Sequence, residues 1–177
     1  MLLRIGIFYG FTFAFTILLA FTQQTFGIEF EKIVLPQLGP GIAALTMLVI
    51  FKRDKAKISL DITSKEISKY AIATLLPFSV LGIVFVIYNR FISPVEIQFD
   101  IPLVFLMALI GMLIGAFGEE IGWRGYLQKL LEQRQNPLIS AILIGLLWGL
   151  WHVGNYQYGL LYLAFFVLSI IGSSVVL

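Results

Sequence analysis

Residues 135–177 form an uncharged run, QNPLISAILIGLLWGLWHVGNYQYGLLYLAFFVLSIIGSSVVL, which contains no Asp, Glu, Lys or Arg. A transmembrane helix needs about 20 apolar residues, so this run is long enough for two. Four more runs without charge precede it, and they are residues 5–28, 33–51, 70–89 and 101–118. The chain is 59% hydrophobic and 12% charged, whereas soluble domains have about 25% charged residues. A soluble globular domain is therefore excluded.

These runs predict an all-α, polytopic helical membrane protein with about six transmembrane helices. We expect residues 1–177 to form a single helical transmembrane domain, with a core hairpin at about 101–157. Prolines 36 and 40 should break the start of the second helix, and Pro77 should kink the third. A short amphipathic helix could follow Asp61. The expected transmembrane helices are 4–24, 34–52, 70–91, 101–128, 138–157 and 159–177.

The basic residues predict the orientation. With a cytoplasmic N-terminus, ten of the twelve Lys and Arg lie on inner segments, and only Lys32 and Arg90 lie outside. By the positive-inside rule we expect both termini in the cytoplasm, in a multi-pass protein of the cell membrane. We interpret the apolar run after Arg4 as the first membrane helix, because it is too long for a signal-peptide core. Membrane lipid is an expected partner, and nucleic acid is not. The chain has no cysteine, which excludes thiolate catalysis.

Two adjacent acids interrupt the fourth apolar run. Glu119 and Glu120 are followed by Arg124, and the only histidine, His152, lies in the next run. Ionisable residues inside membrane helices are rare and usually functional. Glu120 and Arg124 are spaced for a helical ion pair. Glu119 points about 100° away, where its carboxylate could activate a water molecule. His152 could hold that water or donate to an oxyanion, so the set suits hydrolysis of an acyl bond.

A hairpin would bring the acid and the histidine to one level. Asn136-Pro137 is the expected turn, with Glu119 17 residues before Asn136 and His152 16 residues after it. At 1.5 Å per residue, both then lie about 24–26 Å from the turn. Both share a helix face with small residues, which are glycines 111, 115 and 122 for Glu119 and glycines 145 and 149 for His152. We expect these glycine faces to meet and carry the two side chains toward each other.

Other roles compete with catalysis. His152 could hydrogen-bond a backbone carbonyl, and Glu120 with Arg124 could be a structural clamp. A divalent metal such as zinc could use Glu119 and His152 as ligands. However, Glu119 and Glu120 point in different directions and no His-Glu-x-x-His is present, so a glutamate-activated water is favoured. We expect the aromatic residues near these positions to pack or to lie at the interface rather than contact substrate, and they are Trp123, Tyr126, Trp148 and Trp151.

The motifs resemble those of the CAAX-protease and bacteriocin-processing (CPBP) family of intramembrane proteases, the Abi family. That family shows Glu-Glu-x-x-x-Arg, matched here by residues 119–124, and an aromatic residue four positions before His, matched here by residues 148–152. The resemblance covers about residues 34–155, with residues 38–44 more loosely similar to the second helix of the family. The two motifs at this separation are specific, whereas either alone would be weak.

The resemblance implies peptide-bond hydrolysis in a membrane-associated, hydrophobic or lipidated protein or peptide, in a cavity open to the cytoplasmic side. It implies that Glu119 activates the water, that Glu120 pairs with Arg124, and that His152 holds the water. Both glutamate and metal mechanisms have been described for the family. Family members also carry a later helix with a second His followed four residues on by Asn or Asp. The sequence to Leu177 has no second His, so either it is truncated or the protein lacks that part of the site.

Two other functions remain open. A non-catalytic membrane protein, such as a bacteriocin-immunity or interaction factor, would not need the second His. A small transporter could use Glu119 and Glu120 as a proton relay, although the sequence shows no inverted repeat of the kind that many transporters have.

Overall fold

The computed structural model describes residues 1–30, 32–51, 75, 79, 82–94, 103–154 and 159–176 of the chain. Over these residues the chain is helical and has no strand, as the apolar runs predict. It divides into one compact unit of Met1–Ser59 with Leu103–Leu177, and another of Leu60–Pro102. The elements of the first unit are α1 (Leu2–Thr25), η1 (Leu35–Leu38), α2 (Gly39–Ile50), α4 (Leu103–Glu120), η3 (Ile121–Gln128), α5 (Lys129–Glu132), α6 (Pro137–Trp151) and α7 (Leu160–Val176).

Within the described residues, three helices are long and apolar enough to cross a membrane, and they are Leu2–Thr25, Phe105–Glu132 and Pro137–Gly154. Leu35–Ile50, Gly82–Phe91 and Leu160–Gly172 are shorter apolar helices. The prediction of an all-α membrane protein is confirmed. The second apolar segment starts as the 3₁₀ turn η1, which contains Pro36, and Pro40 lies in the first turn of α2. The predicted amphipathic helix and the kink at Pro77 lie outside the described residues.

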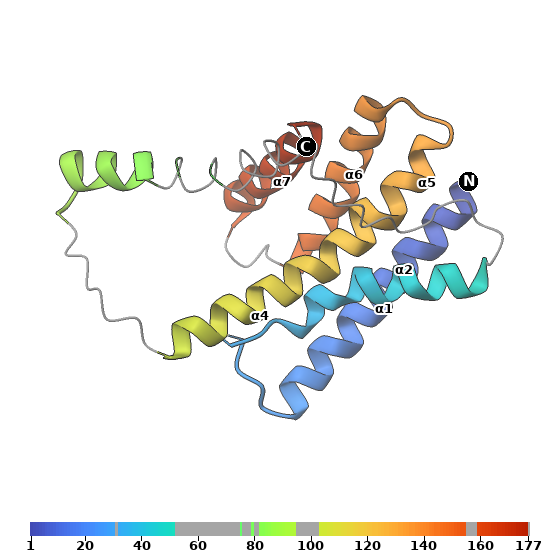
Figure 1. Ribbon diagram of the computed structural model, residues 1–177, viewed down its shortest axis with the longest axis horizontal. Coiled ribbons are helices and arrows are strands. Elements are labelled where there is room, and N and C mark those ends of the chain that lie inside the picture. Colours follow the sequence, from blue (N-terminus) through green and yellow to red (C-terminus); the bar gives the residue numbers. More distant parts are fainter. Residues whose placement is uncertain are drawn as a thin grey trace. The chain divides into compact units, whose positions relative to one another are not determined.

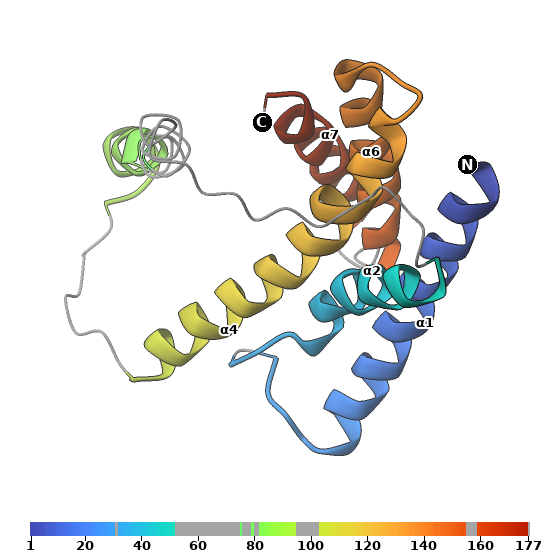
Figure 2. The ribbon, with the colours of Figure 1, turned by 45° about the vertical axis from the view of Figure 1, so that its right-hand side comes forward.

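The first unit is built on a helical hairpin against a helical pair. The hairpin consists of α4, η3 and α5 on one arm and α6 on the other, and Asn136 caps α6 by accepting a hydrogen bond from the Ile139 N–H at 2.8 Å. In both ribbon views α1 and α2 lie beside the long arm (Figures 1 and 2). The end of α1 and the start of α4 lie at one end of the unit, and the turn at Asn136 lies at the other. Residues 103–154 therefore form a hairpin, which lies within the range expected from the sequence.

Glycines on α4, η3 and α6 let neighbouring helices pack closely, but these helices are not the ones that we expected from the sequence. Gly118 packs against Gly41 of α2, and Gly122 packs against Pro40. On α6, Gly145 and Gly149 pack against α7. The prediction that the two glycine faces meet is wrong, because each contacts a different third helix. The arm η3 meets α6 through large aromatic rings instead: Trp123 stacks on Trp148 with ring centroids 6.0 Å apart.

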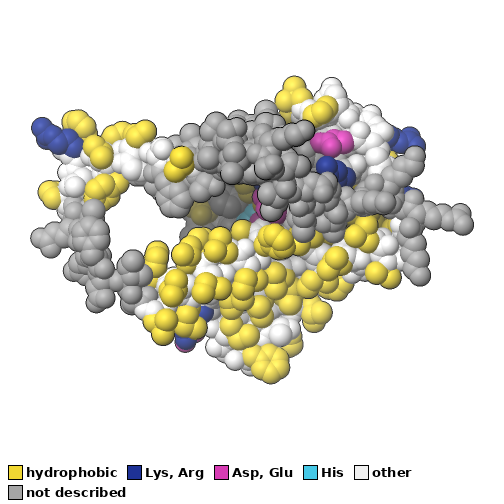
Figure 3. All heavy atoms as spheres, viewed as in Figure 1, with side chains coloured by type: hydrophobic (Ala, Val, Ile, Leu, Met, Phe, Trp, Pro, Cys, Tyr) yellow, Lys and Arg dark blue, Asp and Glu magenta, His cyan; other side chains and the backbone are white. Residues whose placement is uncertain are grey.

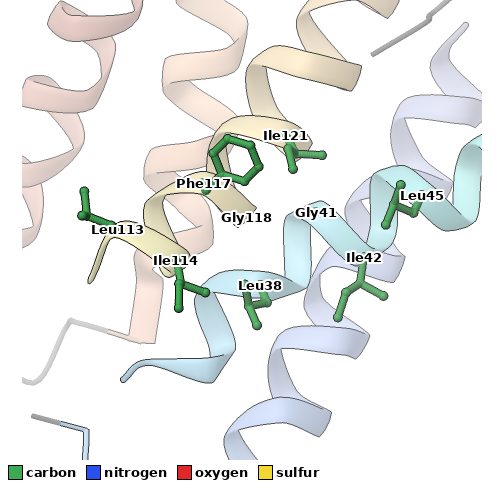
Figure 4. A pocket seen from close by; sticks show the side chains of 9 residues that line it. All are labelled: Leu38, Gly41, Ile42, Leu45, Leu113, Ile114, Phe117, Gly118 and Ile121. Atoms are coloured by element: carbon green, nitrogen blue, oxygen red, sulfur yellow. The ribbon is translucent and has the colours of Figure 1, made fainter. Parts of the chain in front are cut away.

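The outer surface of the first unit is apolar. Figure 3 shows hydrophobic side chains along the described part of the visible face, over α4 and the helices beside it. Between α2 and α4 they border a groove of about 450 Å³. Figure 4 shows Leu38, Ile42 and Leu45 on one side of this groove. On the other side lie Leu113, Ile114, Phe117 and Ile121, and the floor is formed by Gly41 and Gly118. Such a surface is suited to contact with hydrocarbon.

Replacement of Gly41 by Ala should destabilise the packing of α2 on α4. The added Cβ would lie 2.8 Å from the Gly118 carbonyl oxygen, which is backbone and cannot rotate away. We expect a loss of about 1–3 kcal/mol in the free energy of unfolding, measured by denaturant titration in detergent micelles. The matched control is Gly10→Ala, whose Cβ would meet no atom within 4 Å. Equal stability of the two variants would contradict this packing.

Candidate active site

Glu119 is held inside the protein by a tryptophan from the opposite arm of the hairpin. It lies near the end of α4, and only 6% of its surface is exposed. The indole Nε1–H of Trp148, on α6, donates a hydrogen bond of 2.8 Å to Glu119 Oε2. A buried carboxyl group is costly unless it is hydrogen-bonded, and this contact spans two membrane helices. The hydrogen bond therefore fixes both the position of the carboxyl and the pairing of the arms.

Trp148 also contacts the other predicted site residues. The Arg124 guanidinium carbon lies 5.2 Å from the centroid of the Trp148 ring, a cation–π distance. The Trp148 carbonyl lies 3.0 Å from Nδ1 of His152. Trp148 therefore contacts three of the four predicted site residues, which are Glu119, Arg124 and His152. From the sequence we expected Trp148 to pack or to lie at the interface, and the structure adds a hydrogen bond from its indole to Glu119.

Glu120 and Arg124 form the ion pair that their spacing predicts. Their side chains are 44% and 23% exposed, so Glu120 lies in a more open environment than the neighbouring Glu119. Arg124 belongs to η3, an eight-residue π-helix that directly follows the two glutamates. π-Helical turns are rare and occur frequently at functional sites. The ion pair and the cation–π contact together keep the Arg124 guanidinium beside the indole that binds Glu119.

His152 ends α6 and is half-buried. Its ring meets that of Trp151 edge-on, with centroids 4.6 Å apart, and its Nδ1 faces the Trp148 carbonyl. This contact is the hydrogen bond to a backbone carbonyl that the sequence left open as the alternative to a catalytic role for His152. With Nδ1–H donating to that carbonyl, Nε2 carries the lone pair of the neutral ring. The carbonyl contact thus orients the imidazole and is compatible with a chemical role for Nε2.

A further residue near Glu119 could not be identified from the sequence. Gln37, on η1, is a second side-chain hydrogen-bonding neighbour of the Glu119 carboxyl. The Gln37 side chain fits against α4 because residue 115 is a glycine. A Cβ atom at residue 115 would overlap Gln37 Oε1. Trp148 had a usable signal, its position four residues before His152. Gln37 had none, because a polar residue beside prolines suggests only a loop.

The described residues do not fit a complete metal site. Among them, no three His, Cys, Asp or Glu side chains are grouped so that they could hold an ion. Catalytic zinc sites use three protein ligands, whereas Glu119 and His152 would supply two. We therefore derive no step through a metal.

Comparison with known proteins gives the family. The family described as type II CAAX prenyl endopeptidase Rce1-like matches residues 101–176, which include both motifs. This part of the chain is therefore similar to the Rce1-like family. The resemblance to CAAX proteases stated from the two motifs is therefore confirmed.

The chain is also similar to staphylococcal proteins named lysostaphin resistance protein A. It is 31% identical to the Staphylococcus epidermidis protein over 165 residues, which cover 90% of this chain and 43% of that protein. It is 29% identical to a Staphylococcus aureus protein over 182 residues, covering 99% of this chain and 43% of the relative. The chain thus spans less than half the length of these relatives.

A double-mutant cycle should detect the hydrogen bond between Trp148 and Glu119. Trp148→Phe removes the donor, and Glu119→Met removes the acceptor at similar length. We expect a coupling energy of about 1 kcal/mol in the free energy of unfolding. The control cycle pairs Glu119→Met with Trp151→Phe, whose indole donates to Thr16 instead. In the control cycle, the effects of the two single substitutions on the free energy of unfolding should add to within about 0.5 kcal/mol. Additivity in both cycles would contradict the contact.

Proposed function

We propose that this chain carries the water-activating half of an intramembrane endopeptidase, with Glu119 as general base. The observation that supports this most is the buried Glu119 carboxyl, which accepts a hydrogen bond from the Trp148 indole, while the carbonyl of the same tryptophan contacts His152. A purely structural acid would gain little from this expensive position. The match of residues 101–176 to a family of CAAX prenyl endopeptidases supports a peptidase.

In the proposed reaction, Glu119 takes a proton from a water molecule while the water oxygen attacks the carbonyl carbon of the scissile peptide bond. Trp148 holds Oε2, so the carboxylate keeps one orientation as the proton moves. His152 Nε2 accepts the second hydrogen bond of the same water. The proton then passes from Glu119 to the leaving amine as the C–N bond breaks. Arg124, fixed by Glu120, places positive charge near the oxyanion.

The proposed substrate is a hydrophobic or lipidated peptide. The apolar groove between α2 and α4 has Gly118 in its floor, directly before Glu119 in the sequence. A hydrophobic segment entering from the bilayer could lie there. The basic residues support an orientation in the cell membrane in which the Asn136 turn and the substrate entrance face the cytoplasm.

A non-catalytic role in resistance is the second candidate. It is supported by the name of the relatives, lysostaphin resistance protein A, which describes a protective effect. Such a protein would act through binding and would not require an ionisable group at residue 119.

Replacement of Glu119 by Gln should separate the two functions. The variant keeps an acceptor for Trp148 but cannot act as the base, so we expect hydrolysis to fall by about 10²-fold or more. Cleavage of a quenched fluorescent peptide with a farnesylated C-terminal cysteine sequence, in proteoliposomes, measures this. The control is Glu132→Gln, in a residue that accepts a hydrogen bond from Gln128 outside the site.

If Glu119→Gln retains full cleavage, Glu119 is not the base. If the variant instead fails to cleave but still protects a lysostaphin-sensitive host as well as the unaltered chain, protection does not depend on catalysis. That second result would favour the binding role for the physiological function.

A further inference from the structure

A second pocket, of about 290 Å³, lies where α1 turns into η1. Its size is sufficient for several water molecules, each of which takes about 30 Å³ in the liquid. Two polar side chains, Lys32 and Gln37, face it together with apolar ones. Lys32 pairs with Glu29 at 2.9 Å, which keeps charged groups at this end of the pocket. The remaining lining residues are Phe30, Ile33, Val34, Ala108 and Met112.

The α4 wall of this pocket is continuous with the face that carries Glu119. Ala108, Met112, Gly115 and Glu119 follow one another at spacings of four, three and four, which places them on one side of the helix. Met112 precedes Glu119 by seven residues, or about 10 Å along the axis. Gly115 lies between them and leaves space on this face. Gln37 occupies that space.

Gln37 therefore contacts both the pocket and the acid. It lines the pocket, and its side chain is a hydrogen-bonding neighbour of the Glu119 carboxyl. Its Oε1 is buried, and no described protein group donates to it. Buried amide oxygens are nearly always hydrogen-bonded, and water is the usual partner when protein supplies none. The free acceptor points to a hydrated position beside Glu119.

The backbone that carries Gln37 is fixed by buried polar contacts. Gln23, fully buried on α1, donates to the Ile33 carbonyl at 2.7 Å and to the Ile28 carbonyl at 3.2 Å, and accepts from the Leu35 N–H at 2.8 Å. The Thr16 hydroxyl contacts the Pro36 carbonyl at 3.4 Å. These contacts hold η1 in one position against α1, so the Gln37 side chain starts from a rigid base.

We propose that this pocket is a water-filled vestibule that supplies the hydrolytic water to Glu119, with Gln37 as the positioning residue between them. The inference rests on the proposed function for the use of the water, but the vestibule itself does not. The segments that line the vestibule, the turn after α1 and the first part of α4, lie at the end of the unit opposite the Asn136 turn (Figure 2). A peptide that enters the groove between α2 and α4 from the bilayer and water that enters through the vestibule would not compete for one entrance, because the two pockets have different lining residues.

Thiol labelling tests the vestibule without reference to activity. The chain has no cysteine, so Ala108→Cys gives a single thiol on the pocket wall. The matched control is Ile110→Cys, two residues on along α4, at an exposed apolar position outside the pocket. A charged methanethiosulfonate reagent needs a hydrated thiolate, so in nanodiscs it should modify residue 108 at least about tenfold faster. Equal rates would overturn the vestibule.

A second experiment tests Gln37. Gln37→Met keeps the length of the side chain but removes its hydrogen bonds, and Gln24→Met is the control at an exposed position on α1. With the farnesylated peptide, we expect kcat to fall about tenfold while KM stays within about twofold, because a water is misplaced and the peptide is not. Labelling at residue 108 should be unchanged. An unaltered kcat, or a rise in KM alone, would overturn the positioning role. If the unaltered chain cleaves nothing, the proposed function fails, and the labelling still decides the vestibule.

Discussion

The site depends on one hydrogen bond inside a membrane helix hairpin, from the Trp148 indole to the Glu119 carboxyl. A carboxyl group at this depth needs a protein partner, because lipid offers none. The indole N–H donates a hydrogen bond to one carboxyl oxygen, but it carries no positive charge and so does not form an ion pair with the carboxyl group. The same tryptophan anchors the His152 ring through its carbonyl and lies under Arg124. Residues from both arms of the hairpin thereby contact one residue, Trp148.

The packing around this bond explains why so many aromatic residues lie nearby. Trp123 is fully buried and stacks on Trp148, while Phe8 of α1 meets Trp123 edge-on at 5.7 Å. Aromatic pairs contribute beyond the area they bury, and rigid rings limit the movement of the indole. Behind the acid, small residues let η1 and α2 approach α4 closely, which brings Gln37 to the carboxyl. Large residues on one side and glycines on the other therefore set the position of Glu119.

Much of this architecture could be predicted from the sequence. Uncharged runs predicted the helices, the spacing of Glu120 and Arg124 predicted their ion pair, and the turn at Asn136 predicted the hairpin. The partners of the glycines could not be predicted, because a helix face of small residues shows that something packs closely but not which helix does. The π-helix after Glu120 was also missed, since no composition rule separates it from an α-helix. The role of Trp148 was missed because the sequence does not show which group faces a tryptophan. Its indole N–H can donate a hydrogen bond only where the fold places an acceptor opposite it, as Glu119 is here.

The most direct test of the account is a solid-state NMR measurement of the dipolar coupling between the Glu119 side-chain carboxyl carbon and the Trp148 indole nitrogen in lipid bilayers. Replacing Trp123 and Trp151 by Phe would leave one indole signal to observe. The account predicts strong dephasing, as expected for a nitrogen that donates to this carboxyl at 2.8 Å. Absence of dephasing, in a sample that retains its fold, would show that the acid and the tryptophan are apart and would contradict the proposed site.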